Sequence, residues 1–253
     1  MLLSIIVPVY NEENTIKKSF LNLKLSLNKN KIFKYEIIFV NDSSYDESER
    51  VILELKEKYK NIKILNNKTN LGFAKTIIKG FLSAKGNYCH ILPADNEHPH
   101  YGLGMIHKFI KKDYDLIIPS VKNTQERNFF RRSASKVYTK LLNFFFKLNV
   151  PYFNGIIIYK TKFIKQVIKI ISNNSFSILA EILIRVLHLN KNVKIKFTEY
   201  LLFAQKNRKS NSFNFRSLIK VTIGLSKLYY DIILSKHYFS FKIFLKKIIR
   251  ATI

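Results

Sequence analysis

Short apolar runs alternate with longer segments of helical periodicity over the first hundred residues. Four runs have the length and β-branched composition of strands: residues 4–9, 35–40, 62–65 and 88–92. In three intervening segments, apolar side chains recur every three or four positions, as on one face of a helix: residues 16–27, 46–59 and 74–81. Strands that alternate with helices form a mainly parallel sheet flanked by helices, so the sequence predicts an α/β fold.

The pattern continues less regularly beyond residue 100. Helices are predicted over residues 103–110, 129–148, 161–171 and 178–189, and strands over residues 116–119, 153–159 and 193–197. No internal repeat and no Gly/Ser-rich linker divides the chain. We therefore expect one α/β domain over residues 1–213, followed by a basic amphipathic helical tail over residues 214–253.

The positive charge lies in the second half. The 253 residues contain 44 Lys and Arg against 17 Asp and Glu, a formal net charge of +27. Residues 1–100 contribute 15 − 11 = +4, and residues 101–253 contribute 29 − 6 = +23. This excess predicts anionic partners. A nucleic-acid-binding protein is one alternative, but no nucleic-acid-binding motif is present, so no specific nucleic acid is expected.

Other compositional features bear on the location of the protein. The single cysteine, Cys89, excludes an intramolecular disulfide and a Cys-based zinc site, which fits a reducing cytoplasm. No uncharged apolar run approaches the roughly 18 residues of a membrane span, and the apolar start lacks the basic segment of a signal peptide. We expect neither a membrane span nor export.

Polar residues follow the first two predicted strands. Tyr10, Asn11 and Glu12 come after the first strand, and Asp42 comes after the second. Loops at the carboxyl ends of parallel strands commonly bind ligands, so an aromatic ring and carboxylates there suit a nucleotide. The alternative is that Asn11 caps the following helix and that Ser44 or Asp46 begins the next one. Each segment taken alone favours capping.

An acidic loop follows the fourth predicted strand. Asp95 and Glu97 lie two residues apart, beside Asn96 and His98. Carboxylate oxygens suit Mg²⁺ or Mn²⁺, which commonly bridge protein and diphosphate. The alternative is a polar loop that caps the helix after Pro99. Upstream, a helix begins within residues 70–75. Its start could bind a phosphate, or these residues could simply cap the helix, and the sequence favours neither.

Taken together and in this order, these segments resemble the family 2 inverting glycosyltransferases with the GT-A fold, in the dolichyl-phosphate mannose synthase-like, polyprenyl-phosphate branch. The resemblance covers roughly residues 3–215, through the motifs at residues 7–12, 41–44, 70–72, 94–99, 180–185 and 208–212. It implies a Rossmann-like sheet and a nucleotide-diphosphate sugar as donor. It also implies these donor-site residues: Pro8, Tyr10, Glu12, Asp42, Asp95 and Arg208. Asp95 and Glu97 would hold the metal, Mg²⁺ or Mn²⁺.

The chain departs from this family in ways that bear on the acceptor. Pro93 replaces the first Asp of an Asp-x-Asp motif, and Asn41 replaces an Asp, which leaves the donor base open. Pro151 and the pair at 178–179 replace acidic residues that are the usual candidates for a catalytic base. A sugar hydroxyl normally needs such a base, whereas a phosphate oxygen is already anionic. Polyprenyl phosphate is therefore the expected acceptor.

Four polar residues lie at one end of the predicted aromatic helix: Arg131, Arg132, Ser135 and Lys136. Arg131 and Ser135 are four positions apart, on one face. The resemblance implies that they contact the acceptor phosphate, and we predict Asp95 and Arg131 as catalytic residues. The alternative acceptor is a hydroxyl of a lipid-linked or cell-surface glycan, with Glu181 or an unrecognised acid as base. An inactive relative is a further alternative, because Pro93 removes a ligand.

Residues 201–253 hold eleven Lys and Arg against one acid, Asp231. One side of the predicted helix is apolar: Leu228, Tyr229, Ile232 and Ile233. We interpret it as an interfacial helix whose apolar face enters an anionic membrane, with the enzyme peripheral on the inner face of the cell membrane. The alternative is a helix packed on the domain. Phe144, Phe145 and Phe146 fit either a prenyl-chain contact or, as we favour, the core.

Overall fold

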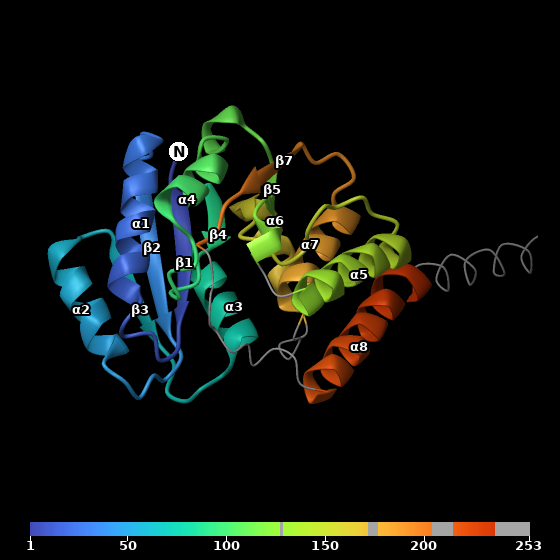
Figure 1. Ribbon diagram of the computed structural model, residues 1–253, viewed down its shortest axis with the longest axis horizontal. Helices are drawn as coiled ribbons and strands as arrows, with labels where there is room; N and C mark the ends of the chain where they lie inside the picture. The colour runs from blue at the N-terminus through green and yellow to red at the C-terminus, as the bar shows by residue number, and fades with distance from the viewer. Residues whose placement is uncertain (127–128, 172–176, 204–214, 236–253) are drawn as a thin grey trace, which may run out of the picture.

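The computed structural model describes residues 1–126, 129–171, 177–203 and 215–235 (Figure 1). Its sheet has seven strands: β1 (Leu3–Val9), β2 (Tyr35–Asn41), β3 (Ile62–Asn66), β4 (Tyr88–Ile91), β5 (Leu116–Val121), β6 (Ile158–Lys160) and β7 (Ile195–Tyr200). Their order is β3-β2-β1-β4-β6-β5-β7. Only β6 runs antiparallel to its neighbours among these strands, so the other six share one direction. The predicted mainly parallel α/β sheet is confirmed.

Helices cover both faces of this sheet (Figure 1). They are α1 (Ile16–Lys29), α2 (Ser48–Lys58), α3 (Phe73–Ser83), α4 (His100–His107), α5 (Phe129–Phe146), α6 (Thr161–Ile168), α7 (Ile178–Leu189) and α8 (Phe215–Tyr229), which continues into a π-helical turn at Tyr230–Leu234. Helices α1, α2 and α4 pack on one face, and α3, α5, α6 and α7 pack on the other. In β1, Ile5 and Ile6 enter opposite cores, because successive side chains point to opposite faces. This explains why every residue of the strand except Ser4 is apolar.

The strand predicted over residues 153–159 is mostly wrong. Only Ile158–Lys160 pairs in the sheet, between β4 and β5. Phe153, Ile156 and Ile157 are buried without belonging to a strand. Their apolar character therefore reflects burial in the core, which a short apolar run cannot distinguish from strand pairing.

Helix α8 packs on the domain at its carboxyl end. Leu228 and Ile232 are 2% and 6% exposed, and both join the core that contains α7. Tyr229 and Ile233 pack against the same core. This apolar side of the helix therefore packs on the domain and does not face a membrane, while the interfacial interpretation of the rest of residues 214–253 stays a prediction. Residues 236–253 lie outside the described part of the chain. No helix within the described residues is both long and apolar enough to span a membrane.

Candidate active site

The predicted site residues gather at one edge of the sheet. Strands β1, β2, β4 and β5 run in the same direction, so the loops that follow them lie at a common carboxyl edge. Pro8 lies in β1, opposite Val40 of β2. The Ile6 carbonyl accepts a hydrogen bond from Leu92 N–H, and Pro8, two residues on, faces the same side, beyond the last paired residue of β4. A proline is tolerated there because no ladder bond is lost.

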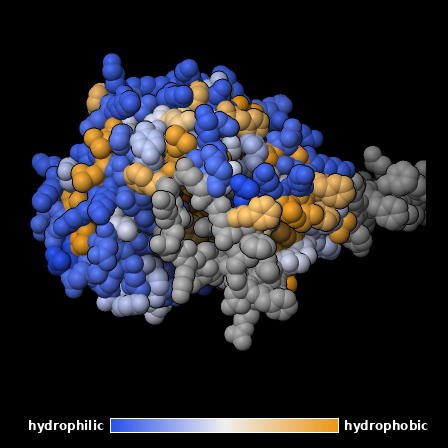
Figure 2. All heavy atoms as spheres, in the orientation of Figure 1, coloured by the Kyte–Doolittle hydropathy of each residue, from blue (hydrophilic) through white to orange (hydrophobic). Residues whose placement is uncertain are grey.

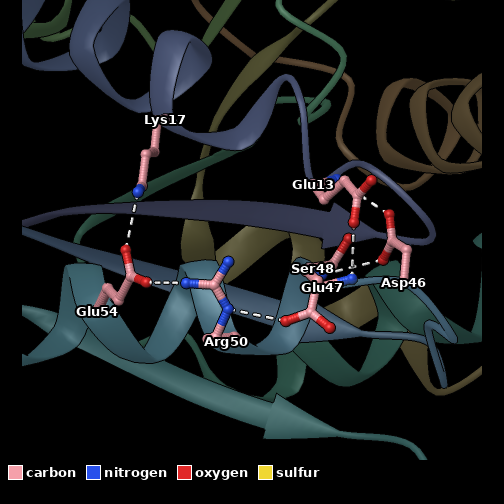
Figure 3. Close-up of polar contacts among 7 residues, drawn as sticks. All are labelled: Glu13, Lys17, Asp46, Glu47, Ser48, Arg50 and Glu54. Carbon is pink, nitrogen blue, oxygen red and sulfur yellow. Dashed lines mark hydrogen bonds and ion pairs between the residues drawn. The ribbon is translucent and has the colours of Figure 1, made fainter.

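The loops after β1 and β2 are joined by reciprocal hydrogen bonds, part of which Figure 3 shows. Five backbone N–H groups donate to side chains of the opposite loop: Asn11 to Ser44 Oγ (3.1 Å), Glu12 to Ser48 Oγ (2.8 Å), Glu13 to Asp46 Oδ2 (3.1 Å), Tyr45 to Asn11 Oδ1 (3.0 Å) and Glu47 to Glu13 Oε2 (2.8 Å). These bonds fix the position of one loop against the other. Further along, Lys17 of α1 pairs with Glu54 of α2 at 2.8 Å.

The capping predictions are wrong for both loops: Asn11 is not the N-cap residue of α1, and α2 begins at Ser48 with Glu47, not Ser44 or Asp46, as its N-cap residue. Helix α1 begins at Ile16 with Thr15 as its N-cap residue, and Asn11 has a left-handed backbone with φ 56°. Asp46 Oδ1 instead accepts the Ser48 N–H at the start of α2 (3.0 Å). Desolvation opposes ionisation of Asp46, but the hydrogen bonds from Ser48 and Glu13 outweigh it and lower its pKa.

Tyr10 and Glu12 belong to the first of these joined loops, between β1 and α1. Tyr10 is 46% exposed, and its ring meets that of Tyr45 edge to face. Glu12 accepts a hydrogen bond from the Thr15 hydroxyl at 2.6 Å. A half-exposed ring and a carboxylate therefore lie at the edge where the donor site is expected, and their role in it stays a prediction.

Asp42 is buried and holds the start of α3. Its carboxylate accepts hydrogen bonds from Asn67 Nδ2 (2.8 Å), Leu71 N–H (2.9 Å) and Gly72 N–H (2.9 Å). Gly72 has φ 81°, a conformation that favours glycine. The carboxylate of Asp42 thus occupies the two N–H groups that a phosphate would need here, although the N-cap residue of α3, Gly72, makes no side-chain cap. Sequence reasoning missed Asn67, which carries no local signal.

The acidic loop after β4 is fixed from two sides. Asp95 Oδ1 accepts the Glu97 N–H at 3.1 Å, and Asn96 accepts a hydrogen bond from Asn22 of α1 at 2.9 Å. On the other side, Phe203 N–H donates to the Glu97 carbonyl at 3.0 Å. This segment leads into residues 204–214, so the predicted Arg208 lies outside the described residues.

The acidic loop suits a cation that a substrate helps to bind. Asp95 and Glu97 are both partly exposed, two residues apart, at the carboxyl edge. Across the described ranges, no group of three or more His, Cys, Asp or Glu side chains is placed to hold a metal. Mg²⁺ commonly binds one or two carboxylates together with substrate phosphates. The residues therefore fit a cation shared with a diphosphate.

A basic hollow of about 390 Å³ lies between the end of β5 and α5. Its lining includes Ser135, as predicted, with Arg132, Lys136, Lys140 and Tyr152. Arg131 belongs to α5, but its side chain is outside the described part. Sequence reasoning noted Arg132 and Lys136 at the end of this helix and did not single out Lys140 or Tyr152. Volumes of this size are typical of small-molecule sites.

A larger hollow of about 750 Å³ lies at the amino ends of β1 and β4. Lys160 lines it, paired with Asp113 at 2.7 Å and Asp115 at 3.0 Å. None of the predicted site residues belongs to it. The carboxyl edge, where the acidic loop and the basic hollow lie, is therefore the better candidate.

Residues 4–168 match the sequence profile of glycosyl transferase family 2, which is well over half of the chain. The chain belongs to glycosyl transferase family 2. This confirms the resemblance inferred from its motifs.

Relatives of this family 2 chain include enzymes named for polyprenyl phosphates. The dolichol-phosphate mannosyltransferase of Pyrococcus furiosus is 31% identical over 54% of this chain and 39% of its own length. The uncharacterized glycosyltransferase YkcC of Bacillus subtilis is 31% identical over 60% of this chain and 47% of its own. The chain thus spans less than half the length of these relatives.

Solved structures of glycosyltransferases share the GT-A fold of this family 2 chain. The mannosyltransferase PcManGT from Pyrobaculum calidifontis, in complex with GDP-Man and Mn²⁺, superposes with a TM-score of 0.63 at 14% identity, over 89% of this chain and 64% of its own. Glucosyl-3-phosphoglycerate synthase from Mycobacterium tuberculosis gives a TM-score of 0.62 at 12% identity, over 90% and 78% of the two chains. The predicted GT-A fold is confirmed.

Glu181, the base named for the alternative acceptor, makes an ion pair with Arg185 in this family 2 chain. It is 4% exposed and accepts a hydrogen bond from Arg185 Nε at 2.9 Å. Arg185 also contacts Asp231 Oδ2 at 3.2 Å, which joins α7 to the turn after α8. A buried carboxylate in an ion pair is poorly placed to take a proton from a substrate hydroxyl.

Proposed function

We propose that this chain transfers one sugar from a nucleotide-diphosphate sugar to a polyprenyl phosphate. The observation that carries the proposal is the basic hollow beside α5, at the same sheet edge as the acidic loop. Its lining contains Arg132, Lys136 and Lys140 and, among the described residues, no Asp or Glu. Such a lining favours an anionic acceptor, because phosphate binds cations through charge-assisted hydrogen bonds.

In this reaction the protein has to position the two substrates and neutralise their negative charge. An acceptor phosphate oxygen attacks the anomeric carbon, and the bond from that carbon to the donor diphosphate breaks with inversion. The attacking oxygen is already anionic, so Ser135, Arg132 and the predicted Arg131 need only bind and orient it. When bound, Mg²⁺ or Mn²⁺ would neutralise charge on the departing diphosphate, and Asp95 and Glu97 would hold it.

The relatives and structural neighbours support both substrates. Among the relatives are a dolichol-phosphate mannosyltransferase and an undecaprenyl-phosphate 4-deoxy-4-formamido-L-arabinose transferase. Complexes of the structural neighbours contain UDP, UDP-GlcNAc or GDP-Man, some with Mn²⁺. A nucleotide-diphosphate sugar as donor and a polyprenyl phosphate as acceptor fit this pattern.

The acceptor lipid requires contact with a membrane, and α5 offers a suitable face. Val137, Leu141 and Phe144 fall at helical spacing and are 56%, 48% and 78% exposed. Of the three phenylalanines expected in the core, only Phe146 is buried there. Figure 2 shows hydrophobic residues gathered over α5. Lys136 and Lys140 lie on the same helix, where they can meet anionic headgroups. We therefore assign membrane contact to α5, with the enzyme peripheral on the inner face of the cell membrane.

The test is transfer of radiolabelled sugar from a panel of UDP and GDP sugars, with Mg²⁺ or Mn²⁺. Undecaprenyl phosphate is the acceptor, and undecaprenol, which has a hydroxyl in place of the phosphate, is its matched control. We expect a labelled lipid product with the phosphate alone. Equal transfer to undecaprenol, or transfer only to a glycan hydroxyl, would contradict the proposal.

A further inference from the structure

Two exposed tyrosine rings stand side by side at the carboxyl edge. We propose that Tyr45 is a second base-contacting residue of the donor site, forming with Tyr10 a corner that receives the flat base of the nucleotide. The inference rests on the proposed function, which supplies the nucleotide. Tyr45 comes three residues after Asp42, in the loop that follows β2.

The geometry of the pair suits a planar ligand. The ring centroids are 6.2 Å apart and the ring planes meet at 86°. Strands β1 and β2 are adjacent and parallel, with Val9 opposite Asn41. The loops that carry Tyr10 and Tyr45 therefore lie at the same edge of the sheet. Because the two rings are nearly perpendicular, a base that stacks on the face of one tyrosine directs its edge toward the other tyrosine. Both arrangements are favourable contacts between aromatic systems.

The loop that carries Tyr45 is held in place. Tyr45 N–H donates to Asn11 Oδ1 at 3.0 Å, and Ser44 N–H donates to Asn41 Oδ1 at 3.1 Å. Asn11 and Ser43 adopt left-handed backbone conformations with φ 56° and 61°. Asn tolerates this conformation, whereas it is uncommon for Ser. These hydrogen bonds and the uncommon backbone conformation at Ser43 thus fix the position of this loop. Strain of this kind is concentrated at binding sites.

Folding alone does not explain the tyrosine at position 45. Its side chain is 84% exposed, so it gains little from burial, whereas Tyr10 is 46% exposed. The backbone of Tyr45 is fixed and its ring meets Tyr10 edge to face, so stacking on a ligand costs less entropy than it would from a mobile loop. Stacking is available to every base, so Tyr45 is expected to increase nucleotide affinity without selecting one base.

The experiment is calorimetric titration of the full chain with UDP, GDP and inorganic pyrophosphate, each with Mg²⁺. Tyr45→Ala should weaken UDP or GDP binding about tenfold and leave pyrophosphate binding unchanged, since pyrophosphate has no base. Tyr45→Phe should bind like the wild type. Phe33→Ala is the matched control, because Phe33 is a 73% exposed ring that precedes β2 at the opposite edge.

Three results would overturn the assignment. Unchanged nucleotide affinity in Tyr45→Ala would remove Tyr45 from the donor site while leaving the proposed function intact. Equal losses for nucleotide and pyrophosphate would show that the substitution disturbs the loop and that the ring does not contact the base. If the wild type binds pyrophosphate but neither nucleotide more tightly, the donor assignment itself fails.

Discussion

Mild acid should destabilise this protein through two buried histidines. His90 of β4 and His107 of α4 are 0% and 1% exposed, and their Nε2 atoms are 3.4 Å apart. Ser26 Oγ lies 2.9 Å from His107 Nδ1, and the Ile91 carbonyl lies 3.2 Å from His90 Nδ1. One assignment of protons satisfies all three contacts: Ser26 donates to His107, His107 donates to His90, and His90 donates to the carbonyl. In it, both rings are neutral.

The size of the effect follows from the pKa of His90. Burial lowers that pKa from 6.5 to about 4, and burial also lowers the pKa of His107. Below pH 6.5 the unfolded chain binds a proton at His90 that the folded chain does not bind until about pH 4. The folded state therefore loses stability as the pH falls through this window. A difference of 2.5 pKa units corresponds to about 3 kcal/mol, and His107 adds to it. Domains are typically stable by only about 5–15 kcal/mol.

Urea denaturation at pH 7.5, 6.5, 5.5 and 4.5, followed by circular dichroism, measures this loss. The pKa values of Asp46, Asp113 and Asp115 are lowered from 3.8, so their stabilising contributions are lost mainly below about pH 4, outside this window. The double variant His90→Phe, His107→Leu removes both titrating groups and should flatten the dependence. A wild-type free energy of unfolding that stays constant between pH 6.5 and 4.5 would refute the reasoning, as would an equal slope in the double variant.

Three further predictions concern the proposed reaction. Asp95→Ala should abolish transfer while the fold persists by circular dichroism; wild-type turnover with Mn²⁺ or Mg²⁺ would contradict the metal assignment. Arg131→Ala should raise the KM for lipid phosphate at least tenfold, since such hydrogen bonds contribute about 1.5–3 kcal/mol, and should leave donor affinity unchanged; the opposite pattern would move Arg131 to the donor site. The double variant Leu141→Glu, Phe144→Glu should sediment less with anionic vesicles than the wild type, whereas Leu25→Glu, at an exposed position of α1, should sediment like the wild type. Equal sedimentation of the wild type, the double variant and Leu25→Glu would exclude membrane contact through α5.

The sequence predicted the parts of this structure that depend on periodicity and strand direction. Apolar runs located β1 to β5, and the shared direction of those strands placed Tyr10, Asp42 and Asp95 at one edge. Both inferences need only local spacing and a general rule for parallel sheets. Ser135 was singled out by the family resemblance, and spacing showed only that it shares a helical face with Arg131.

Contacts between distant segments were beyond such reasoning. Asn and Ser are common in caps and in loops alike, so the sequence favoured Asn11 as a cap although it binds the loop 34 residues further on. The apolar face at Leu228 and Ile232 has the same spacing whether it meets a membrane or the core. Only the packing of α8, with Asp231 against Arg185, separates these two interpretations.

The arrangement of the sheet explains why acidic residues are concentrated in the first half of the chain and basic residues in the second. The first hundred residues carry 11 of the 17 acids, and in the structure several of them fix loops: Asp42 holds the start of α3, while Glu13 and Asp46 join the loops after β1 and β2. The acidic loop after β4 faces the proposed donor diphosphate. Beyond it, β5 and α5 present cations to the proposed acceptor. In this arrangement the donor half relies on carboxylates that bind backbone N–H groups or a metal, and the acceptor half supplies the positive charge that two phosphorylated substrates require when they meet.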